Sequence, residues 1–337
     1  MEHLPDIYFT PEYGRLYETH EGGVLESFEH QTPDGTVYFQ FLRRPLTGFQ
    51  GFERYGDITT PYGYGGPVIL GTASDKKRLA QTFAAAFREY CLDHQIVASF
   101  IRFHPVINNA ADFTQAFDTV IPLRKTVAID LTKDIFNEEF DQTVRNSYRH
   151  AAERGLSIQF DSALETMDDF TRLYYDLMAS KQTSAYYFFP PSYFEALKGL
   201  HGRVELVNAL MDGEIVASVL YLKYQPYIHT HLTTTTPAGN KTRAIGYIKA
   251  ARALRAKEEG YLLNHLGGGF SNSPDDSLFH FKSRFSNSPP FDFCVGKSIY
   301  DQKTYDALVA AAARQGETTD TGYFPRYRAP RLKGSSS

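Results

Sequence analysis

The 337-residue chain has no tryptophan, only two cysteines and no long apolar run. Cys91 and Cys294 lie far apart, and neither belongs to a CxxC pair, so the sequence predicts neither a disulfide framework nor a cysteine zinc site. A reducing compartment suits such a chain, and we expect a cytoplasmic protein. No stretch approaches the ~20 apolar residues of a membrane helix, and residues 1–6 lack the pattern of a signal peptide. We therefore expect no integral membrane segment.

Neither basic nor acidic residues are in large excess: the net charge is −4 and the pI is about 6.3. Domains that bind nucleic acid over a broad surface usually have a pI above roughly 9, so a broad basic surface is not expected; the net charge does not exclude a local basic patch. Aromatic residues, in contrast, are abundant, with 23 Tyr and 26 Phe. Tyrosine suits a wet binding site because its ring buries apolar surface while its hydroxyl keeps a polar partner, but ordinary cores use it too.

Length and patterning predict two α/β (α+β) domains whose mixed sheets are flanked by helices. We expect an N-terminal domain over 1–136, a C-terminal domain over 137–325 and a flexible basic tail over 326–337. The clearest elements are amphipathic helices at 74–94, 140–154 and 242–260, and an antiparallel three-stranded run at 203–211, 214–224 and 226–236.

Residues 261–285 form the most unusual stretch. An apolar run at 261–266 reads as a buried strand and ends in three glycines, after which Asp276 or Ser277 can cap a short helix. On that helix Lys282 shares one face with Leu278, Phe281 and Phe285. A lysine among aromatic side chains must either reach solvent or bind an anion. The pattern therefore fits the wall of an anion-binding site as well as a surface helix whose lysine extends into water.

Three other places carry candidate ligand-binding groups. The glycine-rich loop at 57–67 holds Tyr62 and Tyr64, which suit either a ligand platform or a plain turn. Arg102 lies on a strand at 97–105, on the same face as His104. Two further arginines, Arg145 and Arg149, form a cationic ridge on one helix, which a solvated helix face also explains.

The strand at 226–236 places Tyr227, His229 and His231 on one face. Such a face is costly to bury against hydrocarbon, so we expect it to border a wet cavity. Two histidines at i and i+2 can also bind a metal ion, but no acidic or cysteine residue stands nearby in the sequence, and we predict no metal.

Taken together, these residues resemble the Fem-type peptidyltransferases (FemAB, FemX, MurM) of the GNAT acyltransferase superfamily. The resemblance rests on a set of short motifs in a fixed order: TPYGYGGP at 60–67, FIRFHP at 100–105, Arg145-Asn146 with Arg149, Ala152 and Gly155, HTHL at 229–232, HLGG at 265–268 and Phe281-Lys282. It covers nearly the whole chain.

The resemblance implies two tandem GNAT-like domains and attack by an amine on the ester of an aminoacyl-tRNA. The acceptor would be a peptidoglycan precursor or another small or nucleotide-linked amine, and no resident cofactor is needed. Lys282 would face the CCA end of the charged tRNA and neutralise a phosphate or stabilise the oxyanion. The remaining expected site residues are His229 and His231 for catalysis, and Tyr62, Tyr64, Arg102, Arg145, Arg149, Gly268 and Phe281 for substrate binding.

Two departures from the resemblance matter. No heptad run is present, so we expect no coiled-coil arm to contact the tRNA body. The GNAT pyrophosphate loop is half met over 243–248, because Ile248 replaces a small residue, which argues against a tight CoA site. Two alternatives stay open: an acyl-CoA-dependent N- or O-acyltransferase acting on a cell-surface sugar or its nucleotide precursor, and a catalytically silent binding module.

Overall fold

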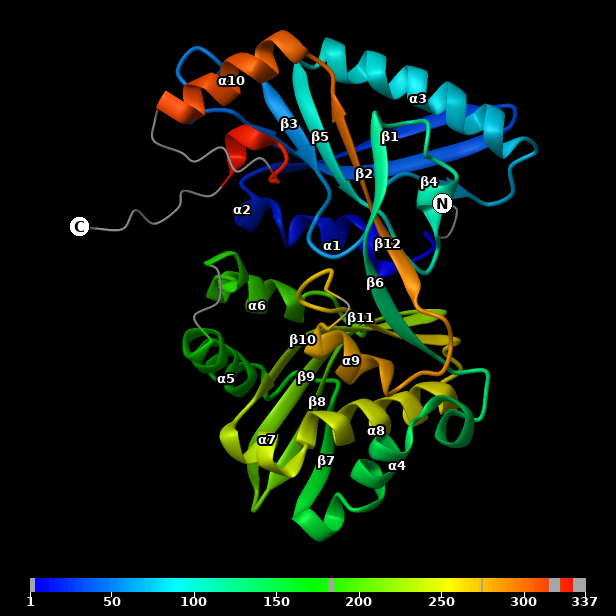
Figure 1. Ribbon diagram of the computed structural model, residues 1–337, viewed down its shortest axis with the longest axis vertical. Coiled ribbons are helices and arrows are strands. Elements are labelled where there is room, and N and C mark those ends of the chain that lie inside the picture. The colour runs from blue at the N-terminus through cyan, green and yellow to red at the C-terminus, as the bar shows by residue number, and fades with distance from the viewer. Residues whose placement is uncertain (1–3, 182–184, 274, 315–321, 330–337) are drawn as a thin grey trace. The chain divides into compact units, whose positions relative to one another are not determined.

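The computed structural model describes residues 4–181, 185–273, 275–314 and 322–329. Contacts divide the chain into two compact units, which are described separately here. Unit 1 contains the residues up to Leu123 and those from Phe293 onward, and unit 2 runs from Arg124 to Asp292 (Figure 1). Among the described residues, no helix has both the length and the apolar character needed to cross a membrane.

Unit 1 is built on a mixed sheet with the strand order β1-β2-β3-β5-β12. Its strands are β1 (Val24–Thr32), β2 (Gly35–Pro45), β3 (Gly56–Thr59), β5 (Ile96–Arg102) and β12 (Phe291–Ile299), with β4 (Val68–Leu70) on β2. β3 and β5 are parallel and the other pairs are antiparallel. The amphipathic helix α3 (Lys76–Asp93), which the sequence predicts, buries Leu79, Phe83 and Phe87 against the sheet. Short helices surround this layer: η1 (Ile7–Phe9), α1 (Pro11–Arg15), α2 (Glu18–Glu21) and η2 (Asn109–Ala111).

The C-terminal part of the chain returns to unit 1. The two units are therefore not separated by a single boundary near residue 136. β12 pairs antiparallel with β5, and α10 (Gln302–Arg314) and η6 (Arg326–Arg328) follow it. The expected flexible tail is wrong for residues 326–329, because Tyr327 is 1% exposed and Arg328 binds Asp57. Residues 330–337 lie outside the described part.

The strands of unit 2 are also mixed in direction and follow the order β6-β11-β10-β9-β8-β7. Its strands are β6 (Thr119–Asp130), β11 (Leu263–Gly268), β10 (Tyr227–Thr235), β9 (Glu214–Tyr224), β8 (Val204–Met211) and β7 (Leu156–Asp161). The predicted antiparallel run β8-β9-β10 is confirmed. Asp212 and Gly213 close its first hairpin with positive φ at both positions, as a type I′ turn requires.

Helices cover both faces of this sheet. On one face, α8 (Ala244–Glu258) and α4 (Gln142–Arg149) pack side by side over Val207 and Val219, and η3 (Ile135–Glu139) and η4 (Ala152–Arg154) flank them (Figure 1). On the opposite face lie α5 (Met167–Ser180) and α6 (Pro191–Lys198), with η5 (Ala185–Tyr187) between them in the chain. Asn208, next to Val207 in β8, points to that face and donates to Thr166 just before α5. Two short helices, α7 (Pro237–Thr242) and α9 (Ser277–Ser283), complete the unit.

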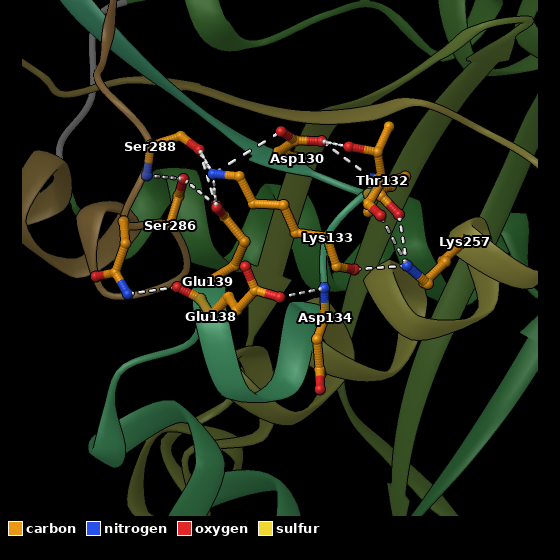
Figure 2. Close-up of polar contacts among 11 residues, drawn as sticks. Asp130, Thr132, Lys133, Asp134, Glu138, Glu139, Lys257, Ser286 and Ser288 are labelled. Carbon is orange, nitrogen blue, oxygen red and sulfur yellow. Dashed lines mark hydrogen bonds and ion pairs between the residues drawn. The ribbon is translucent and has the colours of Figure 1, made fainter.

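A buried carboxylate fixes the chain that follows α9. Glu139 is 0% exposed and accepts hydrogen bonds from Lys133 at 2.8 Å, from Ser286 at 2.5 Å and from Ser288 at 2.9 Å (Figure 2). Burial alone would raise the pKa of Glu139, but these hydrogen bonds outweigh it and lower the pKa below its ordinary value. The ionised carboxylate therefore ties the segment after α9 to η3.

We predict that Glu139→Gln lowers the free energy of unfolding at pH 7 by about 1–3 kcal/mol, because the buried donors lose their charged acceptor. Since the folded pKa is depressed, the contribution of Glu139 is fully present above the unfolded pKa of ~4.3 and is lost as the pH falls through the folded pKa. Denaturant unfolding at pH 7 and pH 4 measures this, and the wild type should lose more stability than the variant. The exposed Glu258→Gln is the control, and an equal effect of both substitutions would contradict the role of Glu139.

Candidate functional site

The two parallel strands of unit 2 pair over a short length only. β10 and β11 are in register from Tyr227↔Leu263 to His229↔His265. Beyond that point β10 pairs with β9, with a bulge between Thr230 and Leu232, while Gly267 and Gly268 of β11 pair with β6. We call the place beyond His229 and His265 the strand fork. Parting strands leave backbone N–H and C=O groups available to another partner, which makes the fork a natural place for a ligand.

Lys282 lies at the β11 side of the strand fork. Its Nζ donates a hydrogen bond to the carbonyl oxygen of Gly268 at 2.7 Å, and Phe281 beside it packs against the core. Burial lowers the pKa of Lys282 to about 8; the carboxylate of Asp276 opposes the shift and the guanidinium of Arg124 adds to it. An ammonium group with this pKa remains mostly protonated at neutral pH and gives up its proton more readily than an exposed lysine.

The glycine turn and the helix cap hold Lys282 in place. Asp276 caps α9, as predicted, by accepting from the N–H of Phe279 at 2.8 Å, and its other oxygen accepts from the N–H of Ser271 at 2.7 Å. These hydrogen bonds lower the pKa of Asp276 to about 2. A Cβ at Gly268 would come within 2.9 Å of the Lys125 carbonyl, and one at Gly269 would overlap the Asp276 carboxylate. The turn therefore requires glycine at both positions.

A second lysine lies at the β10 side of the strand fork. Lys249 of α8 is 2% exposed, and its Nζ lies 3.2 Å from the hydroxyl of Thr230. Burial, with a smaller contribution from the charge of Lys282, lowers the pKa of Lys249 well below its ordinary value. Burial therefore favours the amine form of Lys249, and the residue is close enough to Lys282 for the two charges to interact.

The histidines lie on the other face of the sheet. His229 is 0% exposed, and its Nδ1 is 3.4 Å from Nδ1 of His265. The Tyr193 hydroxyl of α6 lies 2.6 Å from Nε2 of His231. Burial and, to a lesser degree, His229 lower the pKa of His231 to about 3, so its ring is neutral at physiological pH. The structure thus places His229 and His231 beside the strand fork but on the face away from Lys249.

In unit 1, the expected site residues gather around the glycine-rich loop. Tyr62 and Tyr64 are half-buried; the ring of Tyr62 lies 6.0 Å from that of Tyr17, and the ring of Tyr64 lies 5.2 Å from that of Tyr8. Arg102 donates from Nη1 to the carbonyl of Thr60 at 2.8 Å. The two loop tyrosines therefore pack against other aromatic rings, and Arg102 holds the start of the loop through a hydrogen bond. The role of the loop in ligand binding remains a prediction.

The two arginines of α4 make local contacts. Arg145 donates to the carbonyl of Phe140 at 2.6 Å, and the Arg149 guanidinium lies 4.8 Å from the ring centre of Phe136. Arg149 is exposed and Arg145 is half-buried. Their proposed contact with substrate phosphates stays a prediction.

Sequence reasoning missed Lys249 and Arg124. Lys249 stands in the middle of an alanine-rich helix, where Ala253 and Ala256 share its inward face at the 4- and 7-residue spacings. A lone lysine on an apolar helix stripe was the available signal, the same signal that singled out Lys282.

Comparisons with known proteins agree with this geometry. Residues 138–282 match a family model described as an acetyltransferase (GNAT) domain. No curated protein sequence matches the chain. Three solved structures are similar over most of their length: FemX (TM-score 0.68, 13% identity, covering 90% of this chain and 95% of that one), the C-terminal domain of a protein assigned as lysylphosphatidylglycerol synthetase from Agrobacterium fabrum (0.57, 15%, 92% and 90%), and a tandem GNAT protein from the clavulanic acid biosynthesis pathway (0.50, 11%, 83% and 84%).

Residues 138–282 thus form a domain that matches the GNAT acetyltransferase family model. The similarity to FemX, at 13% identity, shows a shared fold, the fold that the resemblance of the sequence motifs implies. The expected fold class, GNAT-type with mixed sheets flanked by helices, is confirmed, and the described residues contain no coiled-coil arm.

We predict that Asp276→Asn lowers the pKa of Lys282 further below about 8, because it removes the carboxylate that favours the ammonium form while keeping a side chain able to cap α9. NMR titration of the Lys282 side chain measures the change. Asp275→Asn removes an exposed neighbouring charge and is the matched control. If both variants shift the pKa equally, Asp276 does not set the charge of Lys282.

Proposed function

We propose that the chain is an aminoacyl-tRNA-dependent aminoacyltransferase that forms an amide bond on an amine-bearing acceptor, a peptidoglycan precursor or a small metabolite. The observation that carries this proposal is Lys282, a cation held over Gly268 at the strand fork with its pKa lowered to about 8. Such a group suits an anionic donor and a reaction that develops negative charge on a carbonyl oxygen.

The main task of the protein in this reaction is to position the acceptor amine against the donor ester. The donor is already activated as an ester, so holding the amine against its carbonyl can supply much of the rate acceleration, up to ~7–11 kcal/mol in ideal cases. Lys282 would stabilise the oxyanion or neutralise the phosphate of the terminal nucleotide. Phe281 and Gly268 would line the site around it, and a catalytic role of His229 and His231 would be exerted from the other face of the sheet, beside the strand fork. No resident cofactor is required, because the donor brings its own activated group.

Two similarities support aminoacyl transfer over other acyl transfers. FemX and the lysylphosphatidylglycerol synthetase domain share the fold over about nine-tenths of this chain. The acidic net charge does not conflict with binding a CCA end, since single-stranded ends are bound by stacking on aromatic side chains with few phosphate contacts. We expect the acceptor side to use Tyr62, Tyr64 and Arg102, with Arg145 and Arg149 for phosphates, and the reaction to take place in the cytoplasm.

One observation favours the alternative, an acyl-CoA-dependent N- or O-acyltransferase acting on a cell-surface sugar or its nucleotide precursor. Arg243 precedes α8 and its side chain does not cap the helix, and a helix N-terminus without a side-chain cap is a place where an anion can bind. Ile248, whose presence in the loop argues against a CoA site, is 0% exposed and packs in the core. It therefore does not cover this helix end.

The two donors are separated by transfer of radiolabel into a small-molecule acceptor extract. Labelled aminoacyl-tRNA should give an amide product that resists mild alkali, and prior treatment with RNase should abolish it. Transfer from labelled acetyl-CoA that RNase does not affect would support the alternative instead.

We predict that Lys282→Met lowers kcat/KM by roughly 100-fold or more with either donor, because a preorganised charge at the oxyanion is lost. Lys303→Met, an exposed lysine in α10, serves as the control and should have wild-type activity. Initial rates at saturating and limiting donor give kcat and KM separately. If Lys282→Met transfers the acyl group as fast as the wild type, the reaction does not take place at the strand fork. That result would favour a binding role for this unit.

A further inference from the structure

Two buried basic side chains, Lys249 and Arg252, lie on one face of α8, and among the described residues only Arg252 forms ion pairs with carboxylates. Arg252 is 0% exposed and forms ion pairs with Glu205 at 2.6 Å and Glu259 at 2.8 Å. Lys249, one turn earlier, is 2% exposed, and its one recorded hydrogen-bond partner is the Thr230 hydroxyl. Burying an ammonium group with no carboxylate beside it is very costly, so burial favours the amine form of Lys249.

The groups that face Lys249 add to the effect of burial on its pKa. From α9, Lys282 contributes a like charge. From β9, Tyr221 lies opposite Thr230 in register and points to the same face, so it adds a hydroxyl and no charge at neutral pH. From β8, Glu205 is engaged by Arg252 of α8 itself and by Lys223 at 3.5 Å. Among the described residues, Lys282 is the one ionisable group whose charge acts on Lys249.

The strand fork gives this amine a path to a ligand. Thr230 is the first β10 residue beyond the last pair with β11, and it is half-buried, whereas Lys249 behind it is not accessible. Its hydroxyl both donates and accepts a hydrogen bond, so it can pass a proton between a group in the fork and the amine behind it. Lys282 at Gly268 stands on the other strand of the same fork.

We propose that Lys249, acting through the Thr230 hydroxyl, accepts the proton whose loss turns the acceptor ammonium into the attacking amine. This inference rests on the proposed function. One ammonium proton moves to Thr230 while the Thr230 proton moves to Nζ of Lys249. The free amine nitrogen then forms a bond to the donor carbonyl carbon, and the ester bond to the ribose oxygen (or the thioester bond, for a CoA donor) breaks. The leaving oxygen or sulfur takes a proton from the Lys282 ammonium, and the second proton that the nitrogen loses restores that ammonium.

A structural lysine and a proton acceptor predict opposite effects of the same substitution. Because the folded pKa of Lys249 lies below the unfolded value, the folded protein loses stability as the pH falls below ~10.4, where the unfolded chain holds the extra proton. Lys249→Met removes this cost and fills the space, so the variant should melt at the wild-type temperature or above at pH 7. Its kcat should nevertheless fall by about 10²–10⁴-fold, the usual value of a general base.

The pH profile identifies the group. Wild-type kcat should rise with pH to a plateau as Lys249 loses its proton, and Lys249→Met should show no plateau and increase with hydroxide. Lys249→Arg should be as inactive as Lys249→Met, because a guanidinium does not lose its proton. Thr230→Ser should keep the profile, and Thr230→Val should lose it. Lys303→Met is the matched control, and Arg252→Met should lower the melting temperature, because it leaves Glu205 buried, without changing the shape of the profile.

A measurement without substrate separates this inference from the proposed function. The side-chain 13Cε and 15Nζ resonances of Lys249 should report an amine at pH 7.5 in the free protein. An ammonium there, or an active wild type whose Lys249→Met variant keeps its rate and profile, overturns the role of Lys249 alone. A wild type that transfers from neither charged tRNA nor acyl-CoA overturns the proposed function, and the role of Lys249 with it.

Discussion

The chemistry of unit 2 depends on the point at which β10 and β11 stop pairing. The register holds for three residues on each strand, and then β10 continues with β9 while β11 continues with β6. Neither strand loses its other neighbour, so the sheet stays intact while its two central strands separate. Everything proposed for this unit follows from that separation, because Thr230 and Gly268, with the lysines that bind them, lie on opposite sides of it.

The basic side chains of this unit fall into two groups, according to their electrostatic partners. Arg252 meets two carboxylates and Lys133 meets Glu139, so both add to the stability of the fold. Lys249 and Lys282 are instead left with a hydroxyl and a carbonyl oxygen as their hydrogen-bond partners, and burial lowers the pKa of each. Groups shifted in this way are common at sites that move protons, although structural networks shift pKa values too. On one face of α8, Arg252 is paired with carboxylates whereas Lys249 contacts a hydroxyl. This difference favours a role for Lys249 in proton transfer over a structural role.

Local patterns predicted well wherever the interactions were local. The hairpin at Asp212-Gly213, the cap at Asp276 and the amphipathic helix α3 each depend on a few neighbouring residues, and each is confirmed. The fate of the C-terminus was not predictable in this way. β12 pairs with β5 almost two hundred residues earlier, and Tyr327 packs beside Phe49, so a segment that reads as a basic tail becomes part of the core of unit 1.

Sequence alone determined the composition of the site: a glycine turn, one lysine among phenylalanines, a histidine strand and the Fem-like motif order, because short-range spacing fixes which side chains share a face. Tertiary structure alone decided which lysines matter and in which charge state. The pKa of Lys249 depends on Lys282, which comes from another helix, and on the absence of a nearby carboxylate among the described residues. Desolvation is a property of the packed environment rather than of any stretch of chain, so no reading of neighbouring residues could have supplied it.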